Sequence, residues 1–230
     1  MGKKEGAEVD FAKLLYPAMQ VADIFVGGFH FSQAGIDQRK ANVIARDVAN
    51  QLKFSPLKIN NEIVKPVAVH HHLLLGLEKP PVGEKNEEAS QTSMKMSKSK
   101  PDSAVFIHDS EEEIRRKIKK AYCPEGEIEF NPIIDWAEYL IFSTEEKITI
   151  ERKPEHGGNL TIKNIDELKE VFSAKGGSAS GGKNKELHPD DLKNFVAEYL
   201  IESLKPAREH FSKGEPKKML NDLEELIKKT

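Results

Sequence analysis

The sequence lacks the features that define membrane, secreted and disulfide-stabilised proteins. Its single cysteine, Cys123, excludes an internal disulfide and indicates a reducing compartment, so we expect a cytoplasmic protein. The longest apolar runs are only a few residues, and the start of the chain, MGKKEGAEVD, has no apolar signal core; no membrane association is expected. The net charge is only −3, so any binding of nucleic acid would depend on local basic patches.

In the first part of the chain, the spacing of apolar residues predicts alternating helix and strand. With 230 residues, 38% of them hydrophobic, the chain is long enough for one or two domains. Apolar spacing predicts a helix over residues 8–25, interrupted by Pro17, and an amphipathic helix over residues 35–52. We expect the second helix to turn one side inward, formed by Ile36, Val43, Ile44, Val48 and Leu52. Residues 65–77 predict a buried strand, which favours an α/β domain with a parallel sheet.

The second part of the chain predicts mainly helices. Ser110 with Glu113, and Asn131 followed by Pro132, are typical of helix starts. Segments on either side of His156-Gly157-Gly158 predict a small hairpin. Further helices are expected over residues 165–172, 188–211 and 217–229. We therefore place a boundary near residue 110, with an α/β domain over 1–110 and a helical domain over 111–230.

A lysine- and serine-rich loop lies just before this boundary. By composition alone it would be a solvated linker, although lysines in a mobile loop can also neutralise a polyphosphate. As an ordered string it reads Lys95-Met96-Ser97-Lys98-Ser99, which resembles the KMSKS signature loop of class I aminoacyl-tRNA synthetases.

A polar stripe lies on the first predicted helix. Tyr16, Gln20 and Asp23 are spaced i, i+4 and i+7 and therefore share one helical face. A stripe of this kind can simply face solvent. Because Pro17 distorts the start of the helix, it can instead point into a pocket, where a phenol, an amide and a carboxylate would bind a hydroxyl-bearing amino acid.

Several motifs occur in the order typical of archaeal and eukaryotic tyrosyl-tRNA synthetases. They are YPAMQVAD, GIDQRK, KMSKS, IRRKIKKAYCPEG, GGNLT and ELHPDDLKN. Tryptophanyl-tRNA synthetases share the fold and the loop and remain an alternative. The resemblance implies the second half of a Rossmann-like catalytic domain, followed by a mostly α-helical anticodon-binding domain.

The resemblance also implies a function, tyrosine–tRNA ligation with ATP and Mg²⁺. By position, Lys95 and Lys98 would be catalytic, within an ATP-binding loop formed by Lys95, Met96, Ser97, Lys98 and Ser99. The tyrosine substrate would contact Tyr16, Gln20, Asp23 and Gln38. No metal ligand is assigned on the chain.

The same resemblance implies contacts with tRNA(Tyr). Arg39 and Lys40 would meet the first base pair of the acceptor stem, with a solvated basic pair on a helix as the alternative. Asp191 would read the first anticodon base, a guanine, unless it serves only the helix dipole. His156 stands where some relatives have an aromatic residue that stacks on that base. The basic residues from Arg115 to Lys120 could attract phosphate or form an ordinary solvated face.

One family motif has no counterpart in the sequence. The His-x-Gly-His element, which handles phosphate in these enzymes, does not occur. We therefore expect that the chain corresponds to the C-terminal portion of a synthetase and does not activate tyrosine alone. A separate N-terminal half would then be a partner, and the family implies a homodimer. A noncatalytic tRNA-binding module remains the alternative.

Two further signals are given little weight. His70, His71 and His72 are consecutive in a predicted strand, so their side chains alternate between faces and cannot converge on one metal ion. Cys123 has no neighbouring histidine typical of a thiol enzyme and is expected to be a packing residue.

Overall fold

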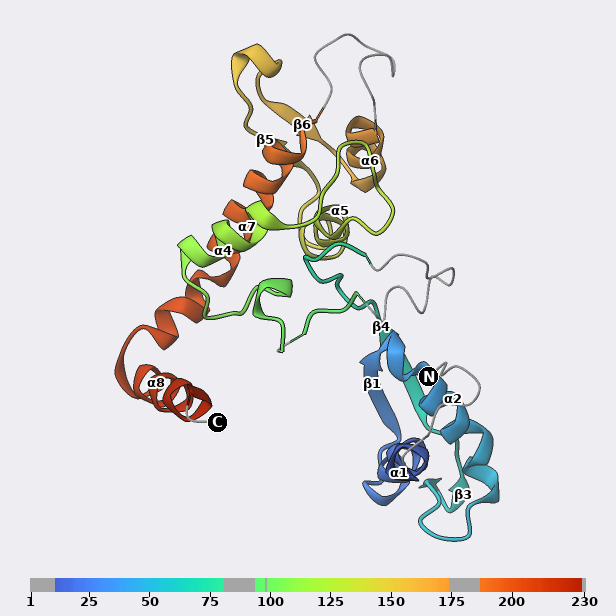
Figure 1. Cartoon of the computed structure of the whole chain (residues 1–230). Helices are drawn as coiled ribbons and strands as arrows, with labels where there is room; N and C mark the ends of the chain where they lie inside the picture. Colours follow the sequence, from blue (N-terminus) through green and yellow to red (C-terminus); the bar gives the residue numbers. More distant parts are fainter. Residues whose placement is uncertain (1–10, 81–93, 98, 174–186, 229–230) are drawn as a thin grey trace. The chain divides into compact units, whose positions relative to one another are not determined.

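The chain divides into two compact units, Met1–Leu73 and Leu74–Thr230. The computed structural model describes residues 11–80, 94–97, 99–173 and 187–228 (Figure 1). The boundary predicted near residue 110 falls inside the second unit, because the described part of the KMSKS loop packs on segments of that unit. The assignment of a catalytic and an anticodon-binding domain stays a prediction.

The first unit combines two helices with a pair of parallel strands. Its elements are α1 (Phe11–Val26), β1 (Phe31–Gly35), η1 (Ile36–Gln38), α2 (Arg39–Val48), η2 (Ala49–Gln51), β2 (Lys58–Ile59), β3 (Glu62–Ile63) and β4 (Val67–His71). Strands β1 and β4 run parallel, with Phe31 opposite Val67 and Gly35 opposite His71. Both predicted helices are present, whereas β1 and the antiparallel β2–β3 pair were not predicted.

The core of the first unit corrects two predictions. It joins Val21, Ile24 and Phe25 of α1 to Ala45, Ala49 and Leu57. Val43 and Ile44, predicted to face inward, are 42% and 47% exposed, because α2 turns its small alanines towards the core. The strand predicted as buried over residues 65–77 ends at His71, and its Val67 is 51% exposed. Only one strand pairs with it in the described part of the chain.

The second unit is mostly helical. Its elements are η3 (Pro101–Ser103), α4 (Glu111–Lys120), α5 (Pro132–Trp136), the π-turn η4 (Ala137–Ile141), β5 (Ile148–Ile150), η5 (Pro154–His156), β6 (Leu160–Ile162), α6 (Ile165–Ser173), α7 (Pro189–Phe211) and α8 (Gly214–Lys228). Helix α4 packs along α7, and β5 pairs with β6 in the predicted hairpin (Figure 1). The helices expected over residues 165–172, 188–211 and 217–229 are confirmed, with ends shifted by a few residues.

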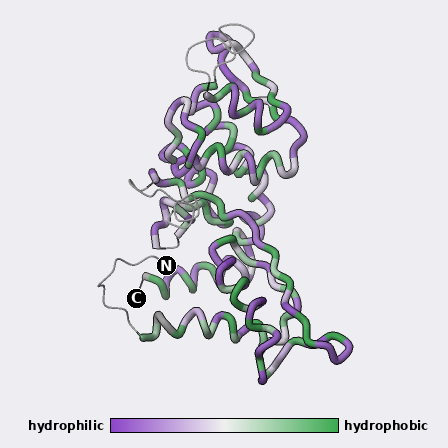
Figure 2. Tube along the Cα trace, turned by 90° about the vertical axis from the view of Figure 1, so that its right-hand side faces the viewer, coloured by the Kyte–Doolittle hydropathy of each residue, from purple (hydrophilic) through white to green (hydrophobic). Residues whose placement is uncertain are grey.

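Capping and amphipathic packing explain the helices of this unit. Ser110 Oγ accepts the Glu113 N–H at 3.2 Å, and Asn131 Oδ1 accepts the Ile133 N–H at 3.0 Å, so both predicted N-caps are confirmed. Hydrophobic and hydrophilic residues alternate along the helices (Figure 2), and the apolar faces meet in one core. The residues of this core that are buried to 1% exposure or less include Ile114, Ile118, Ile133, Ile150, Ile162, Leu168, Leu192 and Val196. None of the helices in the described ranges is long and apolar enough to cross a membrane.

Cys123 is a buried packing residue, as the sequence indicated. Its side chain is 8% exposed, and its Sγ accepts a hydrogen bond from Asn131 Nδ2 at 3.4 Å. Burial raises the pKa of the thiol above its usual range, which keeps it protonated and unreactive at neutral pH.

A buried ion pair provides a test of the second unit. Lys117 Nζ lies 2.6 Å from Asp109 Oδ2, with side chains 3% and 9% exposed, and 4.5 Å from the centre of the Phe106 ring. Lys117→Met leaves the Asp109 carboxylate buried without its cation, so we expect the free energy of unfolding to fall by about 3–5 kcal/mol. Urea unfolding followed by the fluorescence of Trp136, the single tryptophan, measures this change.

Two control variants isolate the ion pair. Lys117→Met combined with Asp109→Asn removes both charges and should recover most of the loss. Lys119→Met, on the same helix but exposed, should change stability by about 0.5 kcal/mol or less. Equal losses in the two lysine variants would refute a specific contribution of the buried pair.

Candidate functional site

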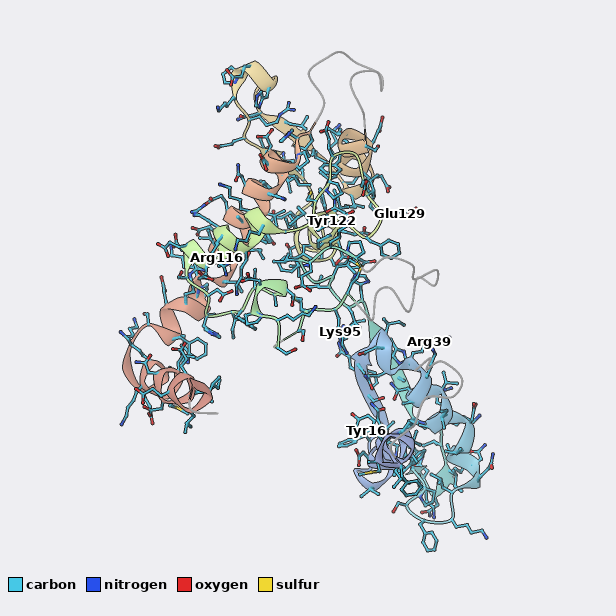
Figure 3. The ribbon with its side chains drawn as sticks, viewed as in Figure 1. Tyr16, Arg39, Lys95, Arg116, Tyr122 and Glu129 are labelled. Carbon is cyan, nitrogen blue, oxygen red and sulfur yellow. The ribbon has the colours of Figure 1, made fainter. Side chains whose placement is uncertain are left out.

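The polar stripe of α1 lies beside its buried face, which Val21, Ile24 and Phe25 form. Tyr16 is 57% exposed (labelled in Figure 3), Asp23 is exposed and Gln20 is half-buried. Gln20 Nε2 donates a hydrogen bond to Oε1 of Gln38, at the end of η1. The fold therefore joins two of the four residues predicted to bind tyrosine, although they are far apart in sequence.

Two exposed cations directly follow Gln38. Arg39 and Lys40 are the first residues of α2, which continues directly from η1 because the Arg39 N–H donates to the Ile36 carbonyl (Arg39 is labelled in Figure 3). Both side chains are exposed. Their contact with the acceptor stem stays a prediction.

The KMSKS loop, Met94–Ser103, is closed at its base by two adjacent backbone amides. The Gly76 N–H donates to the Met94 carbonyl at 2.5 Å, and the Leu77 N–H donates to the Ser103 carbonyl at 3.0 Å. Both ends of the loop are therefore held by consecutive residues. A side chain at position 76 would place its Cβ 2.7 Å from the Met94 carbonyl oxygen, so only glycine permits this approach.

The segment that holds the loop is itself fixed to the last two residues of α5, Asp135 and Trp136. The Leu75 N–H donates to Asp135 Oδ2 at 3.0 Å, and Trp136 Nε1 donates to the Leu75 carbonyl at 2.7 Å. Both hydrogen bonds are buried. The sequence analysis did not find these supporting residues. The one signal available was Gly76 inside an apolar run, which often marks close approach of another backbone.

Inside the loop, serines organise the backbone and the described lysines are exposed. Ser103 is 3% exposed; its Oγ accepts the Ser97 N–H at 3.1 Å and donates to the Lys100 carbonyl at 2.7 Å. Lys95 forms an isolated antiparallel bridge with Leu75, and its side chain is exposed (Figure 3). The predicted catalytic residue Lys98 lies outside the described residues.

The two predicted anticodon residues lie side by side in the second unit. His156 ends η5 between the hairpin strands, and Asp191 lies in the first turn of α7. Nδ1 of His156 is 4.0 Å from Oδ2 of Asp191, whose side chain is 19% exposed, whereas that of the neighbouring Asp190 is 74% exposed. A ring beside a partly shielded carboxylate can stack on a base while the carboxylate accepts its hydrogen bonds.

Intramolecular ion pairs occupy most of the basic cluster on α4. Arg115 pairs with Glu198 of α7, Arg116 with Asp102 and Glu113, and Lys117 with the buried Asp109. The Arg116 guanidinium holds the pKa values of the Asp102 and Glu113 carboxyls below their usual range. Most of the cluster is therefore paired within the chain, although Arg115 remains 48% exposed. Lys119 and Lys120, at the end of α4, are also exposed, and Lys120 Nζ lies 4.0 Å from Asp102.

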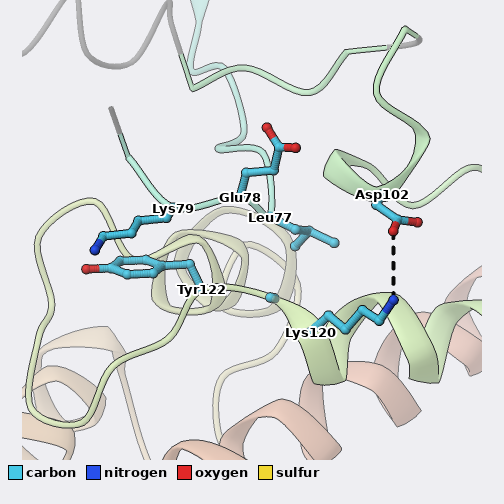
Figure 4. A pocket seen from close by; sticks show the side chains of 7 residues that line it. Leu77, Glu78, Lys79, Asp102, Lys120 and Tyr122 are labelled. Atoms are coloured by element: carbon cyan, nitrogen blue, oxygen red, sulfur yellow. Dashed lines mark ion pairs between the residues drawn. The ribbon is translucent and has the colours of Figure 1, made fainter. Parts of the chain in front are cut away.

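A small pocket of about 220 Å³ lies between the segment after Leu77 and the end of α4 (Figure 4). Lys79 and the Tyr122 ring lie along one side, and Asp102 and Lys120, 4.0 Å apart, form the other. Burial raises the pKa of the Tyr122 hydroxyl, which donates to Glu127 at 3.0 Å. The pocket carries cations and carboxylates together and indicates no single class of ligand.

The three consecutive histidines do not form one site. Nε2 of His70 is 3.0 Å from Nδ2 of the buried Asn42, whereas Nδ1 of His71 is 2.9 Å from the His72 carbonyl. Across the described ranges, no three histidine, cysteine or carboxylate side chains are placed to hold a metal ion.

Comparison with known proteins shows extensive similarity to one family. Residues 2–205 match the family described as class I tRNA synthetases (W and Y). The chain is 53% identical to the tyrosine–tRNA ligase of Thermococcus sibiricus, over 97% of this chain and 59% of that protein. It is 54% identical to that of Thermococcus kodakarensis, over 97% and 58%. The crystal structure of the Pyrococcus horikoshii tyrosyl-tRNA synthetase with L-tyrosine matches with a TM-score of 0.80 and 50% identity, over 96% and 58%. The chain thus spans 58–59% of the length of these relatives.

The base of the KMSKS loop can be tested by substituting its glycine. Gly76→Ala forces the new Cβ against two carbonyl oxygens of the loop ends, and we expect a loss of about 1–3 kcal/mol in stability. Hydrogen exchange followed by mass spectrometry should show faster exchange at Gly76, Leu77 and Ser97. Gly35→Ala is the control, because its nearest new contacts are side-chain atoms of Leu73 and Asp37. Unchanged exchange in the loop of the Gly76 variant would contradict this account.

Proposed function

The chain belongs to the class I tRNA synthetases of the tryptophan and tyrosine family, and we propose that it serves the ATP-dependent attachment of tyrosine to tRNA. The observation that carries this proposal is the identity of more than 50%, over 97% of the chain, with proteins named tyrosine–tRNA ligase. The contacts between Gln20 and Gln38 and between His156 and Asp191 add geometric support.

We propose two chemical steps. The tyrosine carboxylate attacks the α-phosphorus of ATP, which forms tyrosyl-adenylate and releases pyrophosphate; the terminal adenosine of tRNA(Tyr) then accepts the tyrosyl group and AMP leaves. Lys95 and Lys98 would neutralise the charge that develops on the departing pyrophosphate. The closed base of the loop supports this role, because it limits where Lys95 can lie. Mg²⁺ would arrive bound to the phosphates of ATP, a common mode for this ion.

The stripe on α1 would bind the amino acid. Asp23 would accept a hydrogen bond from the phenolic hydroxyl of tyrosine, and Tyr16, Gln20 and Gln38 would complete the polar contacts. A site that hydrogen-bonds a hydroxyl leaves its polar groups unpaired when phenylalanine binds, which disfavours that amino acid. The Gln20–Gln38 contact supports this assignment, because it brings the amide of Gln38 to the stripe.

The tRNA would contact both units. Arg39 and Lys40 would meet the acceptor stem, whose phosphates suit exposed cations at the start of α2. In the second unit, which would form the anticodon-binding domain, Asp191 would accept hydrogen bonds from the guanine at the first anticodon position, and His156 would stack on that base.

We further propose that additional polypeptide completes the sheet of the first unit. Phe31, Val67 and Val69 of the parallel pair are 59%, 51% and 44% exposed, whereas parallel sheets are normally covered on both faces. The covering polypeptide would be the N-terminal half of a Rossmann-like catalytic domain, with the phosphate-handling histidine motif. The chain would then be the C-terminal portion of a synthetase that functions as a homodimer.

Tyrosine activation by the chain alone tests the catalytic proposal. We expect no tyrosine-dependent ATP–pyrophosphate exchange from the 230 residues. Exchange should appear when the segment of the Thermococcus sibiricus ligase that this chain does not cover is added, and tyrosine rather than tryptophan should drive it. Exchange at a family-like rate without that segment would overturn the first expectation. Binding of tRNA without any rescue of exchange would indicate a noncatalytic tRNA-binding module.

Anticodon recognition predicts a difference between two neighbouring aspartates. Asp191→Asn should weaken binding of a tRNA(Tyr) transcript about tenfold or more, because it loses charged hydrogen bonds to guanine. Substitution of that guanine in the transcript should weaken tRNA binding by the wild-type chain to the same extent. It should weaken binding by the Asp191→Asn variant little further. Filter binding at fixed salt measures both effects. Asp190→Asn, on the same turn but exposed, is the matched control; equal losses in both variants would contradict base recognition by Asp191.

A further inference from the structure

The C-terminal end of the KMSKS loop, its exit, is linked to α4 by the side chain of one arginine, Arg116. We propose that Arg116 is a positioning residue, which fixes the loop, and through it Lys95, by holding Asp102 of η3. The importance of this role for catalysis rests on the proposed function, whereas the anchoring itself does not.

The guanidinium of Arg116 bridges two carboxylates. Its Nη2 and Nη1 donate to the two oxygens of Asp102 at 2.6 and 3.3 Å. Its Nε and Nη2 donate to Glu113, one turn earlier on α4, at 3.1 and 2.8 Å. Because Glu113 orients the planar group from within the helix, the other edge presents a fixed fork to Asp102.

The arginine stands on a rigid support. Its neighbours Ile114 and Ile118 on α4 are 0% and 1% exposed and belong to the main core of the second unit. Asp102 lies next to Ser103, which accepts the Ser97 N–H and whose carbonyl receives the Leu77 N–H. The fork therefore fixes η3 at the point where the loop returns to its base (Arg116 is labelled in Figure 3).

Other cations near the exit cannot replace this contact. Lys120 Nζ is 4.0 Å from Asp102 and its side chain is 65% exposed (Figure 4), so it adds charge but no defined geometry. Lys100 pairs with Glu78 at 2.9 Å, and both side chains are more than half exposed. Arg115, the neighbour of Arg116, donates a hydrogen bond to Glu198 of α7 rather than to Asp102.

Hydrogen exchange on the full chain tests the anchoring without any assay of activity. Arg116→Gln and Asp102→Asn should each speed exchange at the Ser97 and Ser103 amides about two- to fivefold, while the Ile114 amide stays unchanged. The double variant should exchange no faster than either single variant. Salt at 1 M should speed the same amides in the wild type but not in Arg116→Gln, because it screens exposed charges. Arg115→Gln is the matched control and should leave the loop unchanged.

Kinetics then test the positioning role in the complemented enzyme. Arg116→Gln should lower kcat for ATP–pyrophosphate exchange about tenfold and leave KM for tyrosine within about twofold, with partial recovery in Arg116→Lys. Unchanged exchange of Ser97 and Ser103, or an equal effect of Arg115→Gln, would overturn the anchoring. Wild-type kinetic constants in Arg116→Gln would overturn the positioning role. If the complemented wild type shows no activity, the proposed function fails, while the amide data still decide the anchoring.

Discussion

The backbone of Leu75, Gly76 and Leu77 is the constraint on which the arrangement of the second unit depends. Its N–H groups donate to Asp135, Met94 and Ser103, and the carbonyls of Leu75 and Leu77 accept from Trp136 and Tyr122. All three residues are buried, so a missing partner would leave a polar group without water. The core helix α5, the end of α4 and both ends of the KMSKS loop are therefore linked through one short extended segment.

This constraint explains how the two ends of a loop rich in lysine and serine are held in place where composition suggests a linker. A flexible linker leaves its backbone groups to water, whereas here Ser97 and Ser103 satisfy each other and the loop ends share one support. The described charged side chains remain exposed. Fixed ends with exposed cations suit the binding of a polyanion, because little further ordering of the backbone is required when the ligand arrives.

Local signals predicted the second unit well and the first unit less well. Ser110 and Asn131 cap helices within a few residues, so their effect can be read from sequence. By contrast, the inward face of α2 depends on its partner: the core uses Ala45 and Ala49 rather than the larger Val43 and Ile44. The requirement for Gly76 likewise arises from a distant backbone; a glycine inside an apolar run indicates a close approach but does not show which segment approaches. The proximity of Gln20 and Gln38 could be anticipated only through resemblance to a family. Hydrophobic periodicity predicts each helix separately, and it does not show which residues meet when a strand lies between the two helices.

The two units also differ in how completely they bury their own apolar residues. The second has a core that connects its helices and its hairpin, and its predicted anticodon residues lie on that framework. The first buries a small cluster and leaves both strands of a parallel pair partly exposed, although its predicted tyrosine-binding residues lie on α1 and η1. Binding to a folded state stabilises that state in proportion to ligand affinity and concentration. Polypeptide that covers β1 and β4 would therefore stabilise the first unit, and with it the helices that carry the residues predicted to bind tyrosine, whereas the core of the second unit is formed among its own helices and hairpin.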